Sequence, residues 1–188
     1  MKNALTALTL ASLVSFSALA ADTYTVDTEG AHASVNFKVE HLGYSFIQGR
    51  FNTFEGEFVY DPANIENSSV SVVVDTTSLD SNHAERDKHL RSGDFINADK
   101  FGIATFTSTE IQDEGEGEFA IIGDLTLHGV TKPITIEAEL IGAGQDPWGG
   151  YRAGFEGETR IELADFGIPV VGASSYVELE LHVEGIKQ

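Results

Sequence analysis

The segment Tyr176-Val-Glu-Leu-Glu-Leu-His-Val-Glu184 alternates strictly between apolar and polar side chains. Val177, Leu179, Leu181 and Val183 share one parity, and mostly charged residues take the other. Successive side chains of a β-strand point to opposite faces, so residues two apart share a face. The segment therefore predicts a strand with one apolar face and one solvated face.

The same alternation recurs along the chain, in the segments 31–40, 54–60, 69–75, 103–109, 119–127, 134–140 and 153–163. With the last segment this makes about eight strands, at hairpin-like spacing in the second half. A long open sheet leaves the backbone groups of its two edge strands unpaired, and closing the sheet into a barrel pairs these groups. The pattern predicts an all-β fold, a single antiparallel eight-stranded barrel with one or two short helices. A two-sheet sandwich is the structural alternative, because alternation does not determine closure.

The apolar side chains of each strand should face the inside of this barrel, and the charged ones should face outward. A membrane barrel has the opposite arrangement, with an apolar outer face. Several inward positions are small: Ala31, Ala33, Gly56, Gly123, Ala138, Ala153 and Gly157. Small inward residues leave room for a cavity that could hold one small ligand. They are equally compatible with a filled core, in which glycines mark bends or large neighbours occupy the space.

The first twenty residues have the pattern of a secretory signal peptide. Lys2 gives a basic start, an apolar run follows, and Ala18-Leu19-Ala20 supplies small residues before the cleavage point. We expect cleavage after Ala20, or one residue later, and a barrel domain over 22–188. A retained membrane anchor is the alternative, but Thr and Ser interrupt the apolar run, which is short for a span.

The chain is strongly acidic, with 30 Asp and Glu against 11 Lys and Arg. Removal of the predicted signal peptide takes away Lys2 and leaves ten basic residues. Such a charge repels nucleic acid and anionic membrane surfaces, so we expect no nucleic-acid partner and no stable membrane insertion. The sequence contains no cysteine, so stability must come from the core.

One segment, 83–92, has a helical pattern, with Asn82 as a capping residue, Glu85 three positions later and Gly93 at the end. Basic residues concentrate here and just beyond: Arg86, Lys88, Arg91 and Lys100. Of these, Arg86, Lys88 and Arg91 are candidates for the barrel rim, where they could contact the polar headgroup of a ligand. Internal pairing with neighbouring carboxylates is the alternative.

No catalytic or metal-binding pattern accompanies the strands. The six histidines, His32, His41, His83, His89, His128 and His182, have no close ligand spacing. A nucleophile elbow, a cysteine nucleophile and a phosphate loop are all absent from the sequence. We therefore expect no catalytic residues, no metal and no cofactor.

Three long motifs carry a family resemblance: 82–92 (NHAERDKHLRS), 123–133 (GDLTLHGVTKP) and 146–155 (DPWGGYRAGF). In this order they resemble the YceI-like family of bacterial periplasmic proteins, over about 22–185. The resemblance implies a lipocalin-like barrel whose apolar tunnel binds a polyisoprenoid, such as an isoprenoid quinone or its precursor. It also implies a periplasmic location, a possible homodimer and no established catalytic activity.

The resulting hypothesis is a periplasmic carrier, scavenger or storage protein for a long-chain isoprenoid lipid. The expected tunnel wall consists of Val35, Phe37, Val39, Phe54, Phe58, Phe106, Phe119, Ile121, Leu125, Ile136, Phe155, Leu179 and Leu181. The segments 41–51 and 82–92 are candidate gates. Two alternatives are an enzyme acting on a small apolar substrate inside the barrel, and a ligand-free structural or interaction protein.

Overall fold

A computed structural model describes residues 21–170 and 174–188; the predicted signal peptide, 1–20, lies outside the described residues. The strands are β1 (Asp22–Val26), β2 (Ser34–His41), β3 (Ser45–Phe51), β4 (Phe54–Tyr60), β5 (Ser69–Asp75), β6 (Leu79–Asp80), β7 (Ile103–Gly115), β8 (Glu118–Leu127), β9 (Val130–Gln145), β10 (Tyr151–Glu162) and β11 (Tyr176–Lys187). The helices are α1 (Ala84–Arg91) and the short 3₁₀ turns η1 (Ile65–Asn67), η2 (Thr76–Ser78) and η3 (Leu163–Phe166).

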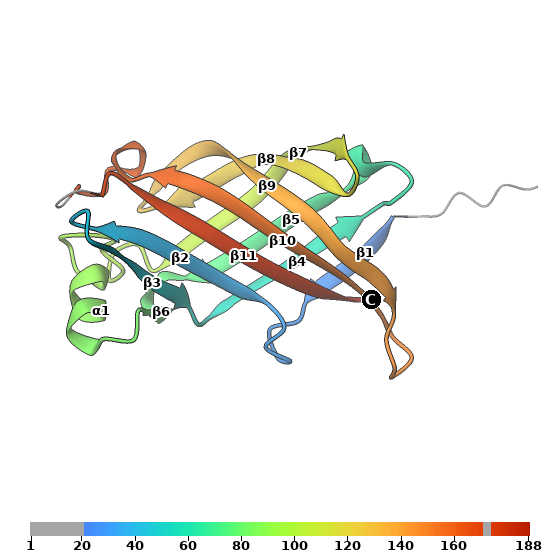
Figure 1. Ribbon diagram of the computed structural model, residues 1–188, viewed down its shortest axis with the longest axis horizontal. Coiled ribbons are helices and arrows are strands. Elements are labelled where there is room, and N and C mark those ends of the chain that lie inside the picture. Colours follow the sequence, from blue (N-terminus) through green and yellow to red (C-terminus); the bar gives the residue numbers. More distant parts are fainter. Residues whose placement is uncertain (1–20, 171–173) are drawn as a thin grey trace, which may run out of the picture.

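These segments form one closed antiparallel barrel of eight strands (Figure 1). Six strands pair in the order β4-β5-β7-β8-β9-β10 and continue to β11. Strand β11 closes the ring. Near its C-terminal end it pairs with β1, where Gly185 lies opposite Val26, and nearer its start it pairs with β2, where Leu181 lies opposite Val35. The pairs β1/β2, β3/β4 and β5/β6 thus each form one interrupted barrel strand. The predicted fold is confirmed, and the sandwich is excluded.

The three interruptions lie side by side, at 27–33, 52–53 and 76–78. Asn52 donates its backbone N–H to the carbonyl of Ser78 at 3.2 Å, and Asp75 donates to the carbonyl of Thr53 at 3.0 Å. Because the first interruption extends to residue 33, the strand that the sequence predicts from Ala31 begins only at Ser34. The backbone at Ala31 is left-handed, with φ 55°, which ends regular strand geometry there.

The inward parity forms the core, and aromatic rings fill most of the space beside its glycines. A Cβ on Gly123 would lie 2.5 Å from the Phe106 ring, and one on Gly185 would lie 2.4 Å from the Phe58 ring. At Gly123 the second of the two alternatives applies, because the ring of a large neighbour, Phe106, occupies the space beside the glycine. At these positions an aromatic side chain from a nearby strand fills the space that the glycine leaves.

Helix α1 lies at one end of the barrel, beside β3 and β6, and the last strand finishes toward the opposite end (Figure 1). His83 caps it in place of the predicted Asn82: its ring Nδ1 accepts the backbone N–H of Arg86 at 3.2 Å. Asn82 instead takes a left-handed conformation, with φ 61°, and Ser92 rather than Gly93 ends the helix. No helix in the described part of the chain is long and apolar enough to span a membrane.

The segment 41–51, a candidate gate from sequence, is mostly strand β3 rather than a loop. It pairs with β2 along its whole length, from Ser45 to Phe51. Gly49 allows the close fit, because the Phe37 ring lies directly over it, 2.2 Å from where a Cβ would stand. Only the turn 42–44 remains outside the sheet in this segment.

Candidate binding cavities of the barrel

The barrel encloses a cavity of about 140 Å³ whose exposed wall is entirely apolar. All eight barrel strands contribute residues to its wall, and β3/β4 does so through Phe54 alone. Small residues on β9 and β10, Ala138 and Gly157, lie on this wall, as the sequence interpretation of a cavity expects. The apolar surface suits a hydrocarbon better than a polar molecule, because a polar group placed there would lose its hydrogen bonds.

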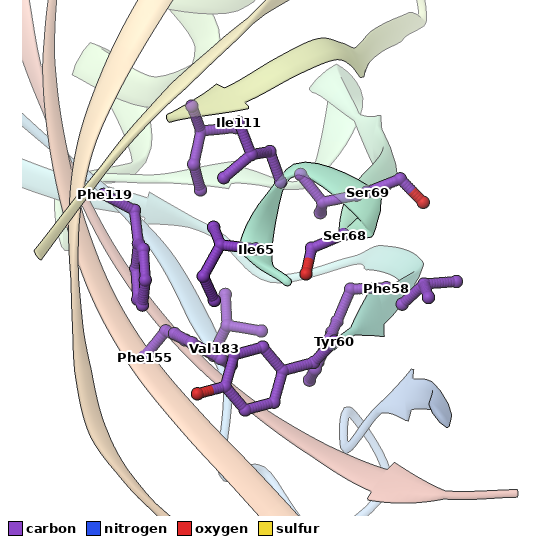
Figure 2. A pocket seen from close by; sticks show the side chains of 12 residues that line it. Phe58, Tyr60, Ile65, Ser68, Ser69, Ile111, Phe119, Phe155 and Val183 are labelled. Atoms are coloured by element: carbon purple, nitrogen blue, oxygen red, sulfur yellow. The ribbon is translucent and has the colours of Figure 1, made fainter. Parts of the chain in front are cut away.

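A second, smaller cavity of about 90 Å³ lies near the end of the barrel where β4 passes to β5 (Figure 2). Strand residues Tyr60, Ile111 and Phe119 form part of its wall. Turn η1 closes this end, and Ile65 points from it toward the strand side chains of the cavity (Figure 2). The wall is apolar apart from a small contribution of polar atoms.

One buried carboxylate holds the connection that carries η1. Asp61, 6% exposed, accepts backbone N–H groups of Ala63 at 3.0 Å and Asn64 at 3.1 Å. It also accepts the side-chain amide of Asn67 at 3.2 Å. The Asn67 hydrogen bond, followed by the two backbone donors, holds the pKa of Asp61 below its usual value despite burial. The connection is thus fixed over the smaller cavity by an ionised side chain.

Most of the predicted wall residues do lie on a cavity wall. Eleven of the thirteen line one or both cavities: Val35, Phe54, Phe58, Phe106, Phe119, Ile121, Leu125, Ile136, Phe155, Leu179 and Leu181. Phe37 and Val39 line neither, because the interruption of β1/β2 places them toward the α1 end, where Phe37 covers Gly49. Their contact with a ligand stays a prediction, as it does for the other eleven.

Sequence reasoning missed further wall residues, namely Val26, Ile65, Val70, Val72, Val74, Ile111 and Ile134. Val70, Val72 and Val74 alternate within β5, so the same period-two signal could have found them. Ile65 carries no such signal, because it belongs to a turn outside any strand.

Two of the three basic residues predicted for the rim, Arg86 and Arg91, attach α1 to the barrel. Arg86 donates to the hydroxyl of Ser81 at 2.7 Å and to its carbonyl at 2.5 Å. Arg91 donates to the carbonyl of Leu79 at 2.6 Å, and Lys88 is exposed. The two guanidinium groups therefore satisfy backbone carbonyls around strand β6, and a headgroup role for the three residues stays a prediction.

A polar cluster lies where β11 changes its partner from β1 to β2. Arg152 donates to Asp27 at 2.7 Å, to Glu184 at 2.5 Å and to Asp146 at 3.1 Å. The ring Nδ1 of His32 lies 2.9 Å from Asp27, whose side chain is only 6% exposed. One cation thus joins three carboxylates from the loop after β1, the β9–β10 turn and β11.

The same cluster holds the one group of possible metal ligands among the described residues, Asp27, His32 and Glu184, whose ligand atoms lie within 4.8 Å of one another. Arg152 already occupies the space between the two carboxylates and supplies their counter-charge. A divalent cation placed there would be repelled by the guanidinium, so the cluster is better explained as a structural ion-pair network.

Acid should destabilise the barrel through this network. The hydrogen bond from Arg152, aided by those from His32 and Gly30, lowers the pKa of Asp27 to about 2. A lowered folded-state pKa gives stability that is present above the ordinary value and lost as pH falls toward about 2. We expect a loss of about 2 kcal/mol of unfolding free energy from Asp27 across this range.

Thermal unfolding of the wild type and Asp27→Asn from about pH 5 down to about pH 2 tests this expectation. The variant should start less stable and lose less stability on acidification. Parallel pH profiles for the two proteins would contradict it.

The protein belongs to the class of closed eight-stranded antiparallel barrels with an apolar internal cavity. Comparison with known families gives the particular group: residues 24–185 match the YceI-like domain. The chain belongs to the YceI-like family, as its motifs predict.

Curated relatives and solved structures agree with this assignment. A UPF0312 protein of Vibrio vulnificus is 71% identical over 183 residues, 97% of this chain and 96% of its own length. The crystal structure of Burkholderia cenocepacia BcnA matches with a TM-score of 0.76 at 20% identity, over 85% of this chain and 98% of that one. A polyisoprenoid binding domain from Saccharophagus degradans, implicated in plant cell wall breakdown, matches with a TM-score of 0.63 at 15% identity, over 88% and 98%. At these identities the two structures show a shared fold.

Proposed function

We propose that the protein binds a long-chain isoprenoid lipid, such as an isoprenoid quinone or a polyprenyl precursor, inside the barrel. In this proposal it acts in the periplasm as a carrier, scavenger or storage protein and catalyses no reaction. The observation that carries the proposal is the larger cavity, whose exposed wall is entirely apolar. The structural likeness to a polyisoprenoid binding domain supports the choice of ligand class.

The energetics favour a ligand with a long hydrocarbon chain. Each methylene removed from water contributes about 0.8 kcal/mol, so several isoprene units give a large gross driving force without a strong polar contact. Part of this is offset by the lost freedom of the chain and of the protein that orders around it. An apolar wall distinguishes such ligands by length and shape, since it offers no hydrogen bonds with which to recognise a headgroup.

The enzymatic alternative receives no support from the cavity walls. Catalysis on an apolar substrate would need an acid, a base or a nucleophile beside the bound molecule. Among the described residues, no histidine lines either cavity. Glu156 borders the larger cavity, but the exposed surface of that wall contains no polar atom. Tyr60, Ser68 and Ser69 border the smaller cavity and contribute only a small polar surface. The cluster around Arg152 lines neither cavity. We therefore propose binding alone.

Organic extraction of the purified protein, followed by mass spectrometry, tests the proposal. We expect about one isoprenoid per barrel, or stoichiometric uptake when stripped protein is offered polyprenyl alcohols and isoprenoid quinones in detergent. A protein that carries no lipid and takes up none of these compounds would favour the ligand-free structural alternative. Fatty acids bound in place of isoprenoids would retain the carrier role but reject the ligand class.

A further inference from the structure

The two cavities are neighbours, and a small set of side chains forms the wall between them. Val70, Ile121, Phe155 and Val183 line both spaces. Phe155 is the largest of the four. Its ring makes edge-to-face contacts with the rings of Phe58, at 5.5 Å, and Tyr60, at 5.2 Å, both on the wall of the smaller cavity. Figure 2 shows Phe155 and Val183 together at the base of that cavity.

Neither cavity is large enough by itself for a long chain. Cavities of about 150 Å³ lined by aliphatic and aromatic side chains accept a guest the size of benzene. The two spaces here, about 140 Å³ and about 90 Å³, are of that size or smaller. A hydrocarbon chain longer than one or two isoprene units would have to occupy both, and so must pass the shared wall.

Of the four wall residues, Phe155 is the one that can move most readily. Val70, Ile121 and Val183 are β-branched, and β-branched side chains are restricted about χ1. Phe155 is unbranched at Cβ, so rotation about its χ1 is less restricted, and like the other three it is half-buried. Along its own strand, the neighbours on the same face are Ala153 and Gly157, which are small.

The backbone at this point is also irregular. The pairing of β10 with β9 shifts register between Gly154 and Phe155, which leaves Ile141 as an extra residue on β9. A β-bulge reorients the side chain next to it and locally interrupts the ladder.

We propose that Phe155 determines the length of hydrocarbon chain that the barrel accepts. Its ring separates the two cavities, and its displacement joins them into one continuous tunnel. A short chain occupies the larger cavity with the ring in place, and a long chain must displace the ring to extend into the smaller one. This inference rests on the proposed binding function and assigns one specificity-determining residue to it.

The test compares Phe155→Ala with Phe106→Ala, a matched variant that removes the same ring from the larger cavity only. Binding constants are measured for a homologous series of polyprenyl alcohols of increasing length. We expect Phe155→Ala to improve binding of long chains relative to short ones by about tenfold or more. Phe106→Ala should leave the ratio of long-chain to short-chain affinity near that of the wild type.

A length profile for Phe155→Ala that matches that of Phe106→Ala would overturn the inference. Phe155→Leu, which keeps most of the apolar volume, serves as the second variant if the alanine variant does not fold. Failure of the wild type to bind any polyprenyl alcohol would reject the proposed function instead. The same variants are then measured with n-alkanols of increasing length, and a length preference unchanged by Phe155→Ala would reject the role of Phe155 itself.

Discussion

Leu181→Trp should weaken the uptake of long apolar chains while the barrel stays folded. Leu181 lies on β11, on the wall of the larger cavity, opposite Gly157 of β10 and Val35 of β2. The indole would extend into the cavity, where Gly157 offers no side chain to obstruct it. We expect the affinity for polyprenyl alcohols to fall by about tenfold or more, with a stability change of about 1–3 kcal/mol at most from overpacking.

The measurement is a binding titration with polyprenyl alcohols, together with thermal unfolding of each variant. Ile103→Trp is the control, because Ile103 is 53% exposed at the start of β7 and lines neither cavity. It adds the same ring without filling the interior. Unchanged binding by a folded Leu181→Trp variant would show that the ligand does not occupy the larger cavity.

Arg152→Met should lower the melting temperature by about 10 °C. Arg152 is the single cation that joins the carboxylates of Asp27, Asp146 and Glu184. Its removal leaves these carboxylates close together without a counter-charge, and Asp27 is nearly buried. Removing one partner of such a pair is far more costly than losing an exposed pair, because the remaining charge stays desolvated.

Arg160→Met is the matched control on the same strand. Arg160 is 54% exposed and pairs with Glu162, which is 46% exposed, at 3.0 Å. Exposed pairs contribute little, so we expect a shift of about 2 °C or less. Equal shifts for the two variants, measured by thermal unfolding at neutral pH, would show that the Arg152 cluster behaves as an ordinary surface network.

The sequence predicts the parts of the barrel in which the alternation is complete. In β11 and β9 the inward and outward parities differ clearly, so both strands and their cavity residues can be found from the sequence. In β3 the outward face includes Phe46, which is 56% exposed, and the inward face includes Gly49. An apolar residue facing outward and a glycine facing inward obscure the alternation of apolar and polar residues. Strand β3 is therefore recognised only from its pairing with β2 in the structure.

The parts of the site that sequence does not predict depend on tertiary contact. Ile65 reaches the smaller cavity from a turn, and the turn is held in place by Asp61. Asp27 and Arg152 are 125 residues apart in the chain, and only closure of the barrel brings them together. Local patterns carry no information on such contacts. Neither turn η1, which closes the smaller cavity, nor the ion-pair cluster around Arg152 therefore has a signature in the sequence.

Closure through the first and last strands has a consequence for the order in which the protein folds. Tyr24 of β1 lies opposite Lys187 of β11, and Asp22 forms an ion pair with Lys187 at 2.6 Å. These contacts span nearly the whole described chain, and contacts of such separation form late and slowly. Until β11 has been synthesised, β1 and β10 each keep a free edge able to pair with another chain. The barrel therefore completes its folding only after synthesis reaches its final strand.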